Sequence, residues 1–295
     1  MPRPEARWLQ VLLAASGAFR VAIGALWLKA YVRMNSGAES AAAMSRIWKS
    51  AQRLRIFFRG EEFYRNRFGR NWREKLLLRI LQEMRRAGLS HEPRVRVSGL
   101  EFLLTNADEK IPTIVVTTHS PVDAVLNRIF RENGIPSSLL VDKAVRISKK
   151  AQLLGLQGEL DTIARTNDAL LIMRRKLNEG RLICACVDFT WPRARSFYVD
   201  VRISPAMFEL AKSMKASILY AENWVSADGH IEVAFGTPTI DTKANTAQAL
   251  SQDFIAWLQK SLGDQRDLRV LKWQRKERRR SGLLKLAGLT ARPDR

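Results

Sequence analysis

The sequence is short of the residues that build disulfides and metal sites: only 2 of its 295 residues are cysteine and only 3 are histidine. Both cysteines, Cys184 and Cys186, stand in an apolar run typical of a buried strand. This supply excludes a disulfide framework and disfavours a zinc cluster, which needs further Cys or His ligands nearby. We therefore predict two buried thiols in a reducing compartment, with no bound metal or other cofactor.

Acidic side chains are also scarce, with 29 Asp and Glu against 50 Lys and Arg and a formal net charge of +21. Such a surplus attracts polyanions, so nucleic acid, anionic lipid headgroups and an acidic protein are the three candidate partners. The sequence contains no zinc-finger, helix-turn-helix or aromatic RNA-binding signature, which disfavours nucleic acid.

One long apolar run is present, Trp8–Leu28, interrupted mainly by Arg20. A helix of about 20 apolar residues spans the bilayer core. Alternatively, the helix lies in the interface with Arg20 at the lipid phosphates, or the run is a cleaved signal peptide. We predict a membrane anchor or interfacial helix over residues 1–34, followed by a helical lead-in over residues 35–93.

From residue 94 onward, short β-branched and apolar runs alternate with helical stretches. We expect strands at Arg94–Leu100, Ile111–Thr118, Leu139–Val141, Leu170–Met173, Leu182–Val187, Ser217–Ala221 and Ile231–Phe235. Helices are expected at Arg174–Gly180, Ala206–Met214 and Thr246–Leu262. The alternation predicts an α/β domain over residues 94–262, with a mixed central sheet flanked by helices, and a basic tail over residues 263–295.

His119 is the histidine best placed for chemistry. It follows the buried run that ends at Thr118, and Ser120 and Pro121 favour the start of a helix directly after it. The positive end of that helix would lower the pKa of the imidazole and keep it neutral, as a base must be. Asp123 would then orient the ring by a hydrogen bond. The structural alternative is that Asp123 completes a capping box and His119 bonds a backbone carbonyl.

Several segments of the chain resemble motifs of one enzyme family. They are Val97–Leu103, Thr118–Asp123, Gly180–Asp188, Phe197–Tyr198 and Ser204–Ala211. On these segments the chain resembles the lysophospholipid acyltransferase superfamily and, within it, the bacterial lipid A biosynthesis (lauroyl or myristoyl) acyltransferases, over most of residues 95–240. The family separates its catalytic histidine and acid by four residues, whereas three separate His119 from Asp123. That departure leaves a catalytically inactive, lipid-binding homologue as the alternative.

The resemblance implies an acyltransferase-like α/β fold and a reaction. An acyl chain would move from an acyl carrier protein or coenzyme A thioester, the co-substrate, to a hydroxyl of a lipid or glycolipid similar to lipid A. His119 would be the general base and Asp123 its orienting acid. Cations beside the motif segments would bind a phosphate of donor or acceptor, unless each is an ordinary solvated side chain: Lys143, Arg146, Arg193 and Arg202. The implied location is the cytoplasmic face of a bacterial inner membrane, with membrane lipids as partners.

Overall fold

The computed structural model describes residues 26–35, 42–53, 72–89, 91–141, 149–156, 158, 160–192, 199–262 and 284–286. The chain divides into two compact units, which we describe separately. The first takes in Met1–Glu61 and Arg79–His91, and the second Glu62–Leu78 and Glu92–Arg295.

The first unit contains helices over residues 26–34 and 42–53 and the second part of α3 (Trp72–Arg86). These helices lie where the sequence predicts helical structure. The predicted membrane anchor falls mainly on residues 1–25, which lie outside the described residues. No helix within the described part of the chain combines the length and the apolar character needed to cross a bilayer.

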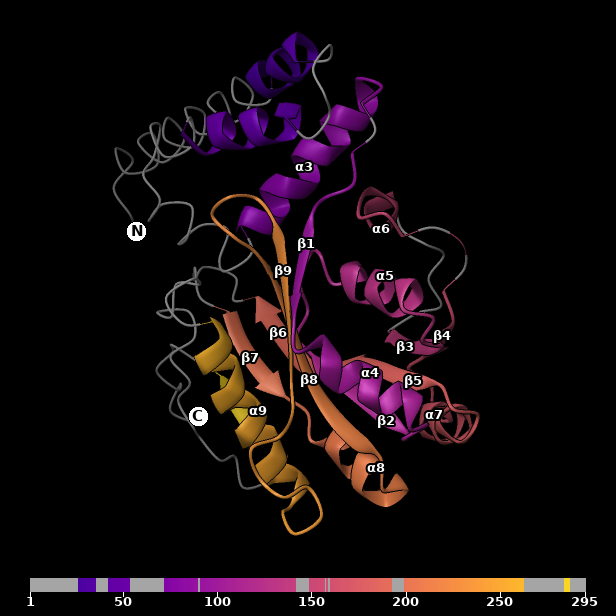
Figure 1. The fold of residues 1–295 in the computed structure, drawn as a ribbon. Coiled ribbons are helices and arrows are strands. Elements are labelled where there is room, and N and C mark those ends of the chain that lie inside the picture. Colours follow the sequence, from indigo (N-terminus) through magenta and orange to yellow (C-terminus); the bar gives the residue numbers. More distant parts are fainter. Residues whose placement is uncertain are drawn as a thin grey trace, which may run out of the picture. The chain divides into compact units, whose positions relative to one another are not determined.

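The second unit is built on a seven-stranded sheet, so the predicted α/β architecture with a mixed central sheet is confirmed. In spatial order its strands are β1 (Val95–Ser98), β9 (Ile231–Gly236), β8 (Ser217–Val225), β2 (Thr113–Thr117), β5 (Leu182–Cys186), β3 (Ser137–Val141) and β4 (Thr162–Ala164). From β8 to β4 all neighbours are parallel, while β9 is antiparallel to β8 and parallel to β1. The flanking helices are α4 (Leu100–Asp108), α5 (Ala124–Glu132), α6 (Lys149–Leu153), α7 (Ala169–Asn178), α8 (Ala206–Met214) and α9 (Ala247–Leu262) (Figure 1).

The central strand β2 shows why the sheet is covered on both sides. All five of its residues are buried, as expected for a parallel strand with helices over each face. Ile114 and Val116 belong to a core shared with α7, α8 and α9. Successive side chains alternate between faces, so Val115 points to the other face. The ring of Phe235 on β9 contacts Phe130 of α5, which places α5 over a part of the sheet outside that core.

One predicted strand is wrong: Leu170–Met173 forms the first part of α7, and the helix predicted from Arg174 is its continuation. A run of four apolar residues fits a buried strand or a helix equally well. Only the spacing of Ala169, Met173 and Leu177 indicates a helix; these three residues are buried on one face of α7.

A second, three-stranded sheet was not expected from the sequence. It pairs β6 (Asp188–Pro192) with β7 (Val199–Ile203) and β7 with β10 (Leu284–Leu286), both antiparallel. The last of these strands lies within the predicted basic tail, and the remainder of residues 263–295 lies outside the described residues.

Candidate active site

The site is built where neighbouring parallel strands end. β2 and β5 are paired with Thr117 opposite Cys186, and two residues beyond these positions stand His119 and Asp188. Arg165 directly follows β4 at the same edge of the sheet. Ligands of open parallel sheets bind at the carboxyl ends of the strands, which makes this edge the first candidate for function.

His119 and Asp188 form a hydrogen-bonded pair. The Nδ1 atom of His119 lies 2.8 Å from Oδ1 of Asp188, and the backbone N–H of His119 donates to the same oxygen at 2.7 Å. The carboxylate is fully buried, whereas 47% of the histidine side chain is exposed. Two bonds to one buried acid fix the orientation of the ring, and the acid on Nδ1 favours the tautomer that leaves Nε2 unprotonated.

The pKa of His119 is raised above its ordinary value. The hydrogen bond to Asp188 is the largest cause; burial acts against it, the charges of Asp188 and Asp123 act with it, and Arg165 opposes them. The lowered pKa predicted from the helix dipole is therefore wrong. The physical reason is that the hydrogen bond and the charge of the Asp188 carboxylate, which stabilise the imidazolium, outweigh the effects that disfavour it.

Asp123 occupies the N-cap position of α5 without a capping hydrogen bond from its side chain. The helix begins at Ala124, and residues 121–123 form a turn in which the Val122 N–H donates to the Ser120 hydroxyl at 3.4 Å. The charge of Asp123 contributes to the raised pKa of His119. Its role as the orienting acid stays a prediction, and Asp188 is the acid that the geometry adds.

Thr118 ties the segment before His119 to a second buried acid. Its hydroxyl donates to Oε2 of Glu222 on β8 at 2.5 Å, and both residues are fully buried. Glu222 lies beside this position because β2 and β8 are parallel, with Val116 opposite Tyr220. This hydrogen bond ties the end of β2, one residue before His119, to the neighbouring strand β8.

Both cysteines lie in β5 as free thiols; Cys184 is buried as predicted, whereas Cys186, at the end of the strand, is only half-buried. Burial raises the pKa of Cys184 to about 12 and the pKa of Cys186 well above its usual value. A thiol is nucleophilic only as thiolate, so neither is suited to attack a substrate at neutral pH.

Arg165 is the cation that the sequence did not single out. Its Nη2 atom donates to the carbonyl of Cys186 at 3.0 Å, two residues before Asp188, and its charge acts on His119. Of the predicted phosphate-binding cations, Lys143, Arg146 and Arg193 lie outside the described residues. The backbone of Arg202 lies in β7, opposite Phe189 of β6.

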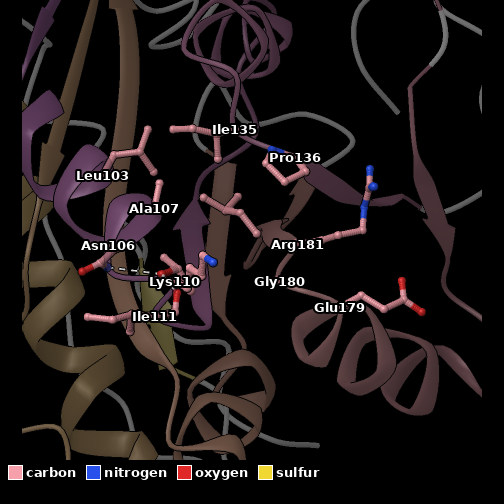
Figure 2. Close-up of a pocket in the computed structure, with 12 residues that line it drawn as sticks. Leu103, Asn106, Ala107, Lys110, Ile111, Ile135, Pro136, Glu179, Gly180 and Arg181 are labelled. Atoms are coloured by element: carbon pink, nitrogen blue, oxygen red, sulfur yellow. Dashed lines mark hydrogen bonds between the residues drawn. The ribbon is translucent and has the colours of Figure 1, made fainter.

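A cavity of about 430 Å³ lies at the other edge of the sheet, where β2, β3 and β5 begin. It is lined by apolar residues of α4 and of the connections before β2 and β3, including Leu103, Ile111 and Ile135. Figure 2 shows Arg181 turned away from α4; its guanidinium pairs with Asp161 at 2.9 Å. The cavity is therefore separate from the His119 edge.

The arrangement around His119 can remove a proton from a hydroxyl and hold the resulting positive charge against a buried carboxylate, with a guanidinium nearby for an anion. No protein-family model matches the chain, and no curated protein matches it.

Proposed function

We propose that the chain is an O-acyltransferase that moves a fatty acyl chain from an acyl carrier protein or coenzyme A thioester to a hydroxyl of a lipid or glycolipid. The observation that carries the proposal is the half-exposed His119 bonded to the buried Asp188 at the carboxyl edge of a parallel sheet. Two segments that resemble acyltransferase motifs, Thr118–Asp123 and Gly180–Asp188, supply these two residues.

The chemistry begins with Nε2 of His119, which takes the proton of the acceptor hydroxyl while its oxygen attacks the thioester carbonyl. The Nδ1–H group stays bonded to Asp188, which stabilises the imidazolium that forms. In this proposal Arg165 neutralises the oxyanion of the tetrahedral intermediate. When the intermediate collapses, the C–S bond breaks and the imidazolium returns its proton to the departing thiolate.

The membrane setting is part of the same proposal. An acceptor lipid of the lipid A type is held in the bilayer, and the predicted helix over residues 1–34 would keep the enzyme at the cytoplasmic face of the inner membrane. The net charge of +21 suits an anionic membrane and an acidic carrier protein as donor.

A catalytically inactive, lipid-binding homologue is the second candidate, because only three residues separate His119 from Asp123. The hydrogen bond to Asp188 weakens this alternative. The buried Asp188 orients the imidazole through Nδ1 whatever the number of residues between His119 and Asp123. The ring therefore keeps an orienting acid even with the shorter spacing.

The test is mass spectrometry of lipids from cells with and without the gene. We expect one lipid class to differ by the mass of one acyl chain, which identifies the acceptor class and the chain length together. The wild-type gene should restore the difference and His119→Ala should not. Unchanged lipids, or restoration by His119→Ala, would contradict the proposal; lipid binding without transfer would establish the inactive homologue.

A further inference from the structure

The outward face of α7 begins with two leucines that the fold does not cover. Leu170 is 50% exposed and Leu171 is 67% exposed. Their neighbour Ala169 and, one turn on, Met173 are buried in the core between α7 and the sheet. The helix is therefore already anchored by its inner face, and the leucine pair adds nothing to that packing.

Two arginines follow one turn later on the same outward face. Arg174 and Arg175 stand four residues after Leu170 and Leu171, the spacing that places side chains one above the other on a helix. Both arginines are exposed; Nε of Arg174 donates to the sulfur of Met214 on α8 at 3.3 Å, and Arg175 pairs loosely with Glu179 at 3.7 Å. The face thus presents aliphatic side chains at its tip and arginines whose backbone lies about 6 Å further along the helix.

This tip lies at the edge of the sheet that carries His119. α7 starts five residues after Ala164, where β4 ends, and β4 runs parallel to β3, β5 and β2. Neighbouring strands are about 4.8 Å apart, so three steps separate β4 from β2 by roughly 14 Å. Arg165 stands between the end of β4 and the start of the helix.

We propose that the first turn of α7 docks on an anionic lipid bilayer, with Leu170 and Leu171 in the interface and Arg174 and Arg175 at the lipid phosphates. Leucines backed by basic residues are the composition of interfacial helices. Protein interfaces favour aromatic anchors, and this face has none. As a route that brings a lipid acceptor to His119, the docking rests on the function proposed above.

A fluorescent probe tests the docking locally, whatever else attaches the chain to the membrane. Because Cys184 is buried and the pKa of the half-buried Cys186 thiol is raised well above its usual value, a Leu171→Cys variant of the full chain can be labelled selectively at neutral pH with an environment-sensitive dye. We expect its emission to shift to the blue on vesicles of phosphatidylethanolamine and phosphatidylglycerol, and brominated lipids to quench it.

The matched control is Phe102→Cys, an exposed apolar position on α4, a helix that packs on β8 and β9. Its dye should not respond. The substitutions Arg174→Gln and Arg175→Gln, made in the Leu171→Cys background, should each weaken the affinity for vesicles by about fivefold. A basic residue near an anionic surface contributes about 1 kcal/mol to binding.

A Leu171→Cys dye that responds no more than the control would overturn the docking. So would a response to an acidic carrier protein or to added unlabelled chain in place of vesicles. The result is independent of catalysis: insertion without acyl transfer would remove the proposed function and leave the docking, and transfer without insertion would do the reverse.

Discussion

Two histidine–aspartate pairs in this chain have the same contact distance and different surroundings. In each, Nδ1 of the histidine lies 2.8 Å from a carboxylate oxygen. His119 and Asp188 are 69 residues apart and join the ends of two strands, whereas His230 and Asp228 are 2 residues apart in the turn between β8 and β9. The carboxylate is 0% exposed in the first pair and 48% exposed in the second.

The second pair belongs to a turn. Partial burial acts to raise the pKa of Asp228, but the Ser226 hydroxyl and the charges of His230 and Arg96 outweigh it and lower that pKa to about 2. The acid thus helps to close the hairpin and to pair with β1. A short His–Asp distance therefore does not by itself distinguish a catalytic pair from a turn. The burial of the acid behind an exposed ring distinguishes His119–Asp188 from His230–Asp228.

The largest expected difference between the two pairs is in kcat, when the aspartate of each pair is replaced by asparagine. Asp188→Asn should reduce kcat for acyl transfer by about 10²–10⁴-fold, because the imidazolium formed in the reaction loses its counter-charge. Asp228→Asn should leave kcat within about twofold, because surface ion pairs contribute little. Circular dichroism checks that both variants are folded, and equal losses in the two would remove the distinction between the pairs.

A smaller difference is expected in the free energy of unfolding, measured with urea, between variants of Thr118, directly after β2, and of Thr113, its first residue. Thr118→Val removes a bond to the buried Glu222 and should lower the free energy of unfolding by about 1.5–3 kcal/mol. Thr113→Val, at the other end of the strand, removes bonds to the neutral Ile111 carbonyl and Asn106 amide and should cost about 0.5–1.5 kcal/mol. Equal costs would show that the bond to the buried carboxyl group of Glu222 contributes no more to stability than bonds between neutral groups.

The smallest expected effect is on the pH dependence of kcat/KM. Because the pKa of His119 is raised and the base must be unprotonated, kcat/KM should rise with pH through that raised pKa and then level off. Arg165 lowers this pKa, so Arg165→Gln should move the rising limb to higher pH, by less than about one unit. Arg96→Gln, beside Asp228, should leave the profile in place. A shift to lower pH in Arg165→Gln would contradict the electrostatics.

Local patterns predicted much of the sheet and the position of His119. β2 and β5 are apolar runs of ordinary strand length, and the spacing along α8 and α9 marks each as a helix. The strand β4 was missed because three residues carry too little periodicity to be recognised. The Leu170–Met173 error followed from the same shortage of signal.

The partners of His119 could not be derived locally, because they arrive through strand pairing. Asp188 ends a motif in the sequence, but its place beside His119 depends on β2 and β5 being neighbours in register. The sequence favours Asp123 as the partner because it is only four residues from His119, and a pair at that spacing can be predicted without knowing the fold. Arg165 needed β4 to be identified first.

The central claim is that His119 is the base of an acyl transfer, and the two histidines provide its most direct test. The measurement is kcat/KM for transfer from an acyl thioester to a lipid hydroxyl by the purified wild-type chain, His119→Ala and His230→Ala. We predict a loss of at least about 10³-fold for His119→Ala and a change within about twofold for His230→Ala. Transfer by His119→Ala at the wild-type rate would contradict the claim.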